Sequence, residues 1–538
     1  MKNLLIILFI LITNLYLSAQ QYHFEWIKEN NIPIETYYGE IIFDKDTNPV
    51  ITGFYSDTMF IEGDTLLPGA SNQTFMHASA FIKFNKNGDY IGYKRENYEA
   101  LGLAIDSENS YYFSGAFTDT VNFENDTMTS NAVHNIYISK YDSLGVYQWS
   151  KQIKYDTVNF SPNGCVHVLS ARINKNDEIL ILGQGNPIFN DTISYPNFNA
   201  IEVSFVAKYN KNGDYLSNVI LPYYSENLYI DNESNIYFKG YVMFDSDTII
   251  FYTDTLLKSN GSFYGMVSND GSSYWIKQNT WITDISVIPN NNGGIHFIGR
   301  VNNDTLIIET DTLYENPTYY KYIIGQYSKN GDLLWYKTFY NKYPSNNKFL
   351  IESDKQGNLY LASTFEDSLN IGGIVIQDTI NRSQIYITKF DSAGNTQWIK
   401  TFGGRSYDKI DILAIDDDCN IYLKGIFDGF SGYPDTCYLD SIQVIFEGDY
   451  NYLIKMSPES NNNYEEISPE TNLFPNPTRG KVIVEAEGIE KIEVFNINGK
   501  QIYTVTEHEI DFSQKPAGIY IIRVTTDKEI ITRKIIKQ

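Results

Sequence analysis

The side chains best suited to chemistry in this chain of 538 residues are its histidines, cysteines and clustered carboxylates. The sequence contains no Gly-x-Ser-x-Gly, no His-Glu-x-x-His and no P-loop. The six histidines have no spacing typical of metal ligands; they are His23, His77, His134, His167, His296 and His508. His296 occupies a position where other copies of a repeat have an aromatic residue, which favours a buried core histidine. We therefore predict a protein that is not an enzyme and that holds no metal or cofactor.

Asp-rich turns are the alternative place for a cation. They precede strand-like runs at Asp44–Asn48, Asp106–Asn109, Asp231–Asn235, Asp354–Asn358 and Asp416–Asn420. Ca²⁺ takes roughly six to eight oxygen ligands. Each turn supplies only a few carboxylates, without the Gly and distal Glu of an EF-hand loop. Asp side chains also hydrogen-bond to the backbone of tight turns. Turn chemistry is the favoured interpretation, and calcium binding is the alternative.

The three cysteines cannot all pair within one chain. Cys419 and Cys437 are candidates for a disulfide, which would leave Cys165 as a thiol. The alternative is that all three are small buried residues, a common role for cysteine.

A triplet of Asp, Thr or Ser, and an aliphatic residue recurs through the chain. Its hydroxyl residues are Thr58, Thr65, Thr120, Thr127, Thr192, Thr248, Thr255, Thr305, Thr312, Ser368 and Thr379. These triplets resemble the acceptor sites of O-glycosylation in exported proteins of Bacteroidota. The resemblance implies that some of these side chains carry glycans. A turn that enters a β-strand explains the same residues, because Thr favours β structure, and both interpretations can hold together.

The elements that position these groups come from a repeat of roughly 60 residues. Each copy has an apolar and aromatic strand that ends at Gly53, Gly115, Gly183, Gly240, Gly299, Ser363 or Gly425. A second landmark is a turn with Gly followed by Trp-x-Lys, as from Gly145 to Trp149. The first and third copies depart, with Gly92 and Ser217 at the Trp position. Each copy thus offers four short strands joined by tight turns, which is typical of a propeller blade.

Seven copies predict an all-β, seven-bladed β-propeller over residues 20–457. The last copy lacks its Trp-x-Lys strand, whereas Phe24–Lys28 is such a strand with no blade before it. Pairing the two would close the ring and cover both sheet edges. The Lys-aromatic-Asp-x-x-Gly-x-x-x-Trp stretches resemble the tryptophan-docked repeats of other extracellular propellers and of quinoproteins. That resemblance implies a structural Trp that packs blade on blade.

Residues 471–538 form a separate module after a polar linker at 458–470. Alternating runs predict strands at 481–485, 491–496, 502–506, 519–524 and 530–536. The motif residues are Pro475, Asn476, Pro477, Gly480, Gly499, Gly518, Tyr520 and Lys534. In this order they resemble the type A C-terminal sorting domain of the Bacteroidota type IX secretion system. The resemblance implies a small Ig-like β-sandwich that the outer-membrane export machinery recognises and that a peptidase then removes.

The amino terminus agrees with export. Residues 1–19 have one Lys, an apolar run and a small-residue end, which predicts a signal peptide cleaved between Ala19 and Gln20. No later segment has the 18 apolar residues of a membrane helix. The two terminal signals together predict a protein secreted to the medium or to the outer cell surface.

These features predict an exported, monomeric propeller that binds an extracellular glycan or protein, because loops on a rigid scaffold are common recognition sites. A net charge of −25 disfavours nucleic acid and anionic membranes as partners. The alternatives are a hydrolase or lyase acting on polysaccharide, and a structural component of the cell surface. Clustered carboxylates with one raised pKa, in a face or in the central channel, would favour the enzyme.

Overall fold

A computed structural model divides the chain into two compact units, Met1–Pro458 and Glu459–Gln538. It describes residues 22–29, 35–55, 58–61, 64–67, 78–157, 164–189, 203–222, 224–242, 249–252, 254–256, 261–279, 282–290, 293–301, 305–308, 311–314, 320–343, 348–377, 383–404, 407–429, 435–440, 442–458, 472–474, 478–485, 488–496, 501–506, 508–516, 518–526 and 530–537. Within these residues all regular structure is β-strand. A helix long and apolar enough to cross a membrane is absent from this part of the chain.

The first unit consists of successive groups of four antiparallel strands. The first three groups are β2 (Glu35–Phe43), β3 (Pro49–Tyr55), β6 (Ala78–Phe84) and β7 (Tyr90–Glu96); β8 (Gly102–Ile105), β9 (Tyr111–Phe117), β12 (Asn135–Tyr141) and β13 (Tyr147–Tyr155); and β14 (Val166–Ile173), β15 (Ile179–Gly185), β17 (Val203–Tyr209) and β18 (Tyr215–Leu221). A short strand, β16 (Pro187–Ile188), pairs with the outer edge of β13.

The remaining groups continue the same order. They are β19 (Ser225–Ile230), β20 (Ile236–Val242), β23 (Gly261–Val267) and β24 (Tyr274–Asn279); β25 (Ile282–Pro289), β26 (Ile295–Val301), β29 (Tyr320–Tyr327) and β30 (Leu333–Tyr343); β31 (Leu350–Ser353), β32 (Leu359–Ile371), β34 (Gln384–Phe390) and β35 (Thr396–Phe402); and β36 (Lys409–Ile415), β37 (Ile421–Phe427), β40 (Tyr450–Pro458) and β1 (Tyr22–Glu29). We number the groups one to seven in this order.

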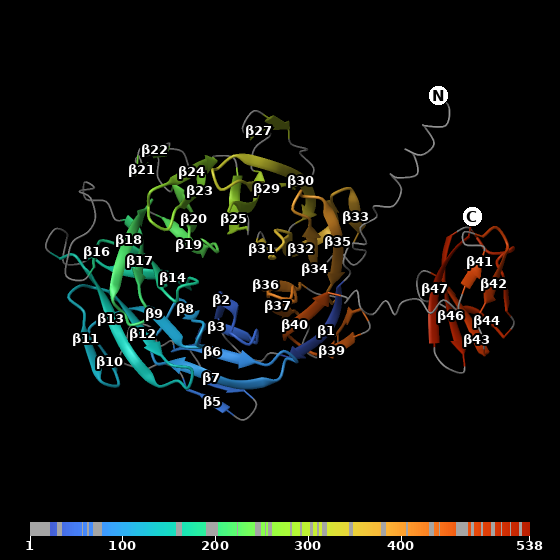
Figure 1. Cartoon of the computed structure of the whole chain (residues 1–538), viewed down its shortest axis with the longest axis horizontal. Helices are drawn as coiled ribbons and strands as arrows, with labels where there is room; N and C mark the ends of the chain where they lie inside the picture. The colour runs from blue at the N-terminus through green and yellow to red at the C-terminus, as the bar shows by residue number, and fades with distance from the viewer. Residues whose placement is uncertain are drawn as a thin grey trace. The chain divides into compact units, whose positions relative to one another are not determined.

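The groups follow one another around a ring, with the first strand of each nearest the centre (Figure 1). First strands of neighbouring groups contact each other around the whole ring, and β36 of the last group contacts β2 of the first. The predicted all-β, propeller-like fold is confirmed. The fifth and sixth groups share one nine-stranded sheet, because β30 also pairs with the far end of β32. Seven separate blades therefore stay a prediction.

The ring closes through the amino-terminal strand, as the sequence predicts. β1 pairs antiparallel with β40, and Trp26 lies opposite Lys455. Apolar side chains of the last and first groups then share one core, in which Tyr422 and Leu453 pack with Ile51. Burying side chains of this size contributes about 1.5–3 kcal/mol each, so closure adds a core and removes two open sheet edges.

Each group has two kinds of connection, and they lie at opposite ends of its strands because neighbouring strands are antiparallel. We name the side with the turns between strands one and two, and three and four, the turn face. The opposite side, the hairpin face, carries small hairpins inserted between strands two and three. These are β4 (Met59–Ile61) with β5 (Asp64–Leu66), β10 (Thr120–Phe123) with β11 (Asp126–Thr129), β21 (Ile249–Phe251) with β22 (Asp254–Leu256), β27 (Thr305–Ile308) with β28 (Asp311–Tyr314), the end of β32 with β33 (Ile374–Gln377), and β38 (Asp435–Leu439) with β39 (Ile442–Phe446).

The second unit contains two sheets around one core. One sheet has the order β41 (Asn472–Phe474), β42 (Lys481–Glu485), β45 (Glu509–Asp511), and the other has the order β44 (Gln501–Val505), β43 (Ile489–Asn496), β46 (Gly518–Thr526), β47 (Ile530–Lys537). Val482 and Ile510 of the first sheet pack with Val494 and Ile522 of the second. Two sheets that share a core form the β-sandwich that the sequence predicts.

Candidate functional site

The Asp-rich turns of the turn face are hydrogen-bonded turns. Asp106 accepts the backbone N–H groups of Glu108 at 3.0 Å and Ser110 at 2.8 Å, and the hydroxyl of Tyr112 at 3.0 Å. Its carboxylate also forms a buried ion pair with Lys140 at 3.1 Å. Burial alone would raise the pKa of Asp106, but these hydrogen bonds and the Lys140 charge lower it below its usual value. The oxygens are thus used within the fold, as the turn interpretation predicts.

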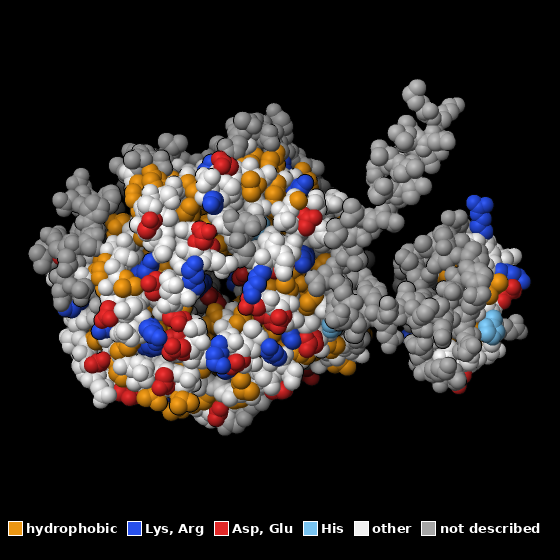
Figure 2. All heavy atoms as spheres, viewed as in Figure 1, with side chains coloured by type: hydrophobic (Ala, Val, Ile, Leu, Met, Phe, Trp, Pro, Cys, Tyr) orange, Lys and Arg blue, Asp and Glu red, His pale blue; other side chains and the backbone are white. Residues whose placement is uncertain are grey.

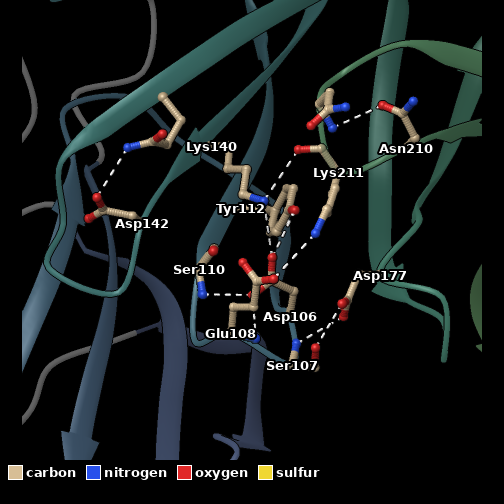
Figure 3. A network of polar contacts seen from close by, with 12 residues as sticks. Asp106, Ser107, Glu108, Ser110, Tyr112, Lys140, Asp142, Asp177, Asn210 and Lys211 are labelled. Carbon is tan, nitrogen blue, oxygen red and sulfur yellow. Dashed lines mark hydrogen bonds and ion pairs between the residues drawn. The ribbon is translucent and has the colours of Figure 1, made fainter.

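Further contacts on this face join neighbouring groups. Figure 3 shows Lys140 of the second group reaching the third, where its Nζ donates to the Lys211 carbonyl at 3.3 Å. In the same view Lys211 pairs with Glu108 at 3.3 Å, and the Ser107 hydroxyl donates to Asp177 at 2.7 Å. The network therefore holds one group against the next.

The tryptophans have the structural role that the resemblance implies. Trp149 Nε1 donates to the Lys211 carbonyl at 3.1 Å, and a Cβ on Gly213 would lie 3.0 Å from the indole. Gly213 has φ +82, which glycine adopts most easily, so it allows both the turn and the close approach. The same donation to the next turn occurs for Trp26, Trp275 and Trp335, at 3.0, 2.9 and 3.0 Å.

The third group has Ser217 at the Trp position, and two further places depart from this pattern for visible reasons. The first group has Gly92 at the Trp position, and Lys94 instead covers Gly145 and donates to its carbonyl at 2.9 Å. Trp398 faces the last group, whose fourth strand comes from the amino terminus and therefore has no turn before it. Tyr22 fills this place, with its ring centroid 5.1 Å from that of Trp398. The indole Nε1 of Trp398 is buried without a hydrogen-bond partner.

The central channel holds a charged cluster that the sequence did not predict. Arg172 of β14 pairs with Glu40 of β2 at 2.8 Å, and its guanidinium lies 5.9 Å from the ring centroid of Tyr229 of β19. Glu352 of β31 completes the cluster. Burial, and then the charge of Glu40, raise the pKa of Glu352 to about 8, although Arg172 opposes this shift. Four first strands thus bring together two carboxyl groups, one of which, Glu352, has a raised pKa.

The surface around the channel mixes both signs of charge. Figure 2 shows a hollow at the centre of the ring, with acidic and basic side chains interspersed around it. Such mixing suits a neutral polar ligand better than a polyanion. The carboxylate pair of the channel is also the arrangement that we set out as favouring an enzyme.

The hairpin face places the Asp-Thr triplets at the start of hairpin strands. Thr58, Thr65, Thr120 and Thr127 are exposed, and Ser368 is partly exposed. Thr305 is the first residue of β27, and Thr255 and Thr312 are the second residues of β22 and β28. The aliphatic residue of a triplet points inward instead: Leu66 and Val121 are fully buried. Exposed Thr followed by a buried aliphatic residue is the alternation expected where a chain enters a β-strand. Where burial is described, the hydroxyl groups lie on the outside. Thr192, Thr248 and Thr379 lie outside the described residues.

The hairpins also expose large side chains next to these hydroxyls. Phe60, 73% exposed, lies across from Thr65 in the first hairpin. In the last hairpin Tyr438 and Ile445 are 64% and 65% exposed, and Gln443 lies opposite Tyr438. These side chains combine flat apolar surface with hydrogen-bonding groups, while buried residues such as Cys437 and Leu439 hold the hairpin from beneath.

Of the two interpretations of the cysteines, the disulfide requires correction. Cys165, Cys419 and Cys437 are all thiols in this structure, so the candidate bridge between Cys419 and Cys437 does not form; Cys437 is buried and the other two are partly buried. The physical reason is placement. Cys419 lies in the turn before β37, where its Sγ contacts Gln356, whereas Cys437 is buried in a hairpin of the opposite face.

The prediction of a core histidine is confirmed for His296, whereas two other histidines lie close to a cysteine. His296 is fully buried, and burial lowers its pKa to about 4, as expected of a core histidine. His134 and His167, which have no motif spacing, lie together with Cys165. The signal that could have found part of this cluster is the alternation of Cys165 and His167 in one strand. His134 comes from another group, and only the fold brings it near.

The sorting residues lie partly within the described part of the second unit. Tyr520 is buried against Phe512, and its hydroxyl donates to the Pro516 carbonyl at 2.8 Å. Gly480 precedes β42, Gly518 begins β46 and Lys534 lies in β47. Pro475, Asn476, Pro477 and Gly499 lie outside the described residues, as do Ala19 and Gln20 of the predicted cleavage site.

Comparison with protein families decides the nature of this unit. Residues 472–538 match the family described as the secretion system C-terminal sorting domain. The chain ends in a sorting domain. The protein is therefore one that a secretion system delivers to the cell surface or beyond, and the predicted resemblance to the type IX system is confirmed for its C-terminal end.

Comparisons of the whole chain are less informative. No curated protein matches it. A protein of unknown function from Bacteroides caccae is 10% identical, with 62% of this chain and 91% of that one covered and a TM-score of 0.28. A Synechocystis apocarotenoid oxygenase variant is 8% identical, covers 68% and 70%, and has a TM-score of 0.33. A gluconolactonase from Xanthomonas campestris is 8% identical, covers 81% and 97%, and has a TM-score of 0.29. Likenesses this weak say nothing about a ligand or an activity.

Proposed function

We propose that the ring is a non-catalytic binding module for an extracellular glycan, delivered by the type IX secretion system and contacting its ligand through the hairpin face. The observation that carries this proposal is the exposed side of the hairpins, where Phe60 and Tyr438 stand beside Thr65 and Gln443. Sugars offer apolar ring faces together with hydroxyl groups. Aromatic faces next to hydroxyl and amide groups match both features.

Export from the cell supports the proposed glycan-binding role. The sorting domain accounts for the carboxyl-terminal end of the chain, and an exported protein meets polysaccharides outside the cell. The turn face is a weaker candidate surface, because its Asp, Lys and Trp side chains are occupied by contacts within and between groups.

The test is a glycan array with the full-length protein, run beside Tyr438→Ser and Phe60→Ser. We expect binding to a restricted set of glycans and a loss of about tenfold or more for at least one variant, since a buried aromatic contact is worth roughly 1–3 kcal/mol. Leu144→Ser is the matched control, because Leu144 is 87% exposed in a turn of the opposite face. Binding that survives both hairpin variants and falls with Leu144→Ser would refute the assignment of the face. An array without any binding would favour a protein ligand or a structural role.

A polysaccharide hydrolase or lyase is the second candidate, and Glu352 with Glu40 in the channel favours it. Two neighbouring carboxyl groups, one of them with a raised pKa, form the kind of pair that glycosidases use as acid and base or nucleophile. Incubating the same glycans with the wild-type protein and with Glu352→Gln separates the candidates. Product release that Glu352→Gln abolishes would establish the enzyme, whereas binding without product supports the module.

A further inference from the structure

Two histidines and a cysteine meet on the hairpin side, where the second and third groups of the ring adjoin. His134 stands directly before β12, Cys165 stands directly before β14, and His167 is the second residue of β14. Their ligand atoms all lie within 4.8 Å of one another. Cys165 Sγ is 2.9 Å from His167 Nε2, and the two imidazole centroids are 5.0 Å apart. The contacts of the turn face and the proposed glycan surface do not involve these residues.

Backbone hydrogen bonds and strand geometry position these three residues. Two hydrogen bonds of 3.2 Å join residues 133–134 to residues 164–166, and they form an isolated parallel bridge between His134 and Cys165. Cys165 and His167 are two residues apart in extended chain, so their side chains project to the same side. Val166, between them, is fully buried on the other side. The three side chains are therefore held around one point by main-chain geometry.

One imidazole nitrogen of the cluster lacks a hydrogen-bond partner among the described residues. His134 Nδ1 is buried and has no hydrogen-bond partner in the described structure. A buried polar atom without a partner costs about 1–3 kcal/mol, and most such atoms are satisfied by protein, water or an ion. His134 is only partly buried as a residue, so a small ion can reach the cluster from solvent.

We propose that His134, Cys165 and His167 bind one Zn²⁺ ion. Zinc takes cysteine sulfur at about 2.3 Å and histidine nitrogen at about 2.0–2.1 Å in a tetrahedron. Ligand atoms in such a site are about 3.3–3.6 Å apart, so Cys165 Sγ and His167 Nε2 need to separate by less than about 1 Å. Binding as a thiolate releases the Cys165 proton to solvent. Calcium and magnesium prefer oxygen ligands, which makes them poor candidates for this set.

The site would act in two ways. It would cross-link the start of β12 to the start of β14, on the side of the ring that lacks the Asp–Lys–Trp contacts. It would also leave the fourth tetrahedral position for water or another small ligand, as in zinc sites with three protein ligands. This inference is independent of the proposed glycan binding, because it concerns different residues.

The experiment uses the full-length protein, freed of metal by a chelator and titrated with Zn²⁺ and with Co²⁺ as a spectroscopic substitute. We expect one equivalent to bind, with the charge-transfer absorption of a thiolate–cobalt bond. Cys165→Ser should abolish that absorption. His134→Gln and His167→Gln should weaken binding at least as much as the roughly 10–100-fold seen on altering outer-shell residues. Cys419→Ser and His23→Gln are the matched controls and should bind as the wild type does.

A second measurement avoids variants altogether. Zn²⁺ should slow alkylation of Cys165 in the native protein and leave the rate at Cys419 unchanged. Equal alkylation of Cys165 with and without Zn²⁺, or a cobalt spectrum without a thiolate band, would overturn the proposal. Binding of copper without binding of zinc would overturn the choice of metal, since two histidines and a cysteine also suit copper.

Discussion

The turn face and the hairpin face of the ring are built differently. On the turn face one set of contacts recurs from group to group. Asp354 in the sixth group accepts two backbone N–H groups, the Tyr360 hydroxyl and the Lys389 ammonium, as Asp106 does in the second with Tyr112 and Lys140. On the hairpin face the backbone plan recurs, but the exposed side chains differ.

This difference shows which side can vary. The repeated contacts are buried, and each Asp side chain binds several partners. One substitution therefore leaves several buried polar atoms without a hydrogen-bond partner. The exposed hairpin side chains rest on buried neighbours and have few partners of their own. A ring whose repeated polar contacts lie on one side can change the exposed side chains of the other side without losing its fold, which is the usual arrangement of recognition surfaces on rigid scaffolds.

The largest effect should come from Asp106→Ala on the turn face. The change leaves the buried Lys140 ammonium without its partner and removes the acceptor of three further hydrogen bonds. Breaking a buried ion pair costs about 3–5 kcal/mol. We expect a free energy of unfolding lower by this amount, measured by urea denaturation of the full-length protein.

Asp142→Ala is the matched control for that experiment. Asp142 accepts two backbone N–H groups in the same way, at 3.0 and 2.9 Å, but in an exposed turn. Its loss should cost about 1 kcal/mol, and Tyr438→Ser on the hairpin face should cost less than about 0.5 kcal/mol. Equal losses for the three variants would remove the distinction between the faces.

The next effect in size concerns the channel and depends on pH. The pKa of Glu352 in the folded protein, about 8, lies above the ordinary value of 4.5. Its contribution to stability is therefore fully present below pH 4.5 and is lost as the pH rises through about 8. We expect a loss on the order of 1–3 kcal/mol across this window, since one pKa unit corresponds to about 1.4 kcal/mol and Glu352 is only partly buried, which reduces the effect.

Glu352→Gln is the variant that checks this account. A neutral amide should remove the part of the pH dependence that comes from this carboxyl, so the variant should gain on the wild type as the pH rises. Glu40→Gln is the control; it breaks the ion pair with Arg172 and takes away the charge that helps to raise the pKa of Glu352. Parallel pH profiles of the wild type and Glu352→Gln would contradict the assignment.

How far the sequence predicts this molecule depends on the range of the interactions. Repeats and turn residues are local, so the four-strand groups, ring closure through residues 24–28 and the strand at 481–485 follow from them. The short strands β41 and β45 were missed because three residues carry little periodicity. The Asp-Thr triplets could have predicted the hairpins, since Thr120 is the first residue of β10 and Thr127, seven positions later, is the second residue of its partner β11.

The charged cluster of the channel and the histidine–cysteine cluster could not be predicted from local sequence patterns. Glu40, Arg172, Tyr229 and Glu352 are each separated from the next by more than 50 residues, and only the ring brings their first strands together. His134 and Cys165 are closer in sequence, but they too meet only because the second and third groups pack side by side. No spacing rule connects such residues, because their distance is decided by how the groups pack.

The smallest expected change in stability tests the hydrogen bond from tryptophan to the next turn. It compares Trp275, which makes this bond, with Trp398, which makes no such bond within the described residues. Trp275→Phe removes the donor of the 2.9 Å hydrogen bond to the Lys329 carbonyl, and a net loss of about 0.5–1.5 kcal/mol is typical of one such bond. Trp398→Phe removes an Nε1 that is buried without a partner, so the same chemical change should cost less there. Both variants lose a similar apolar volume, and the difference between their urea midpoints isolates the hydrogen bond to the next turn. If Trp398→Phe proves as costly as Trp275→Phe, packing alone holds the groups together, and the recurring contact to the neighbouring turn is not what distinguishes the turn face.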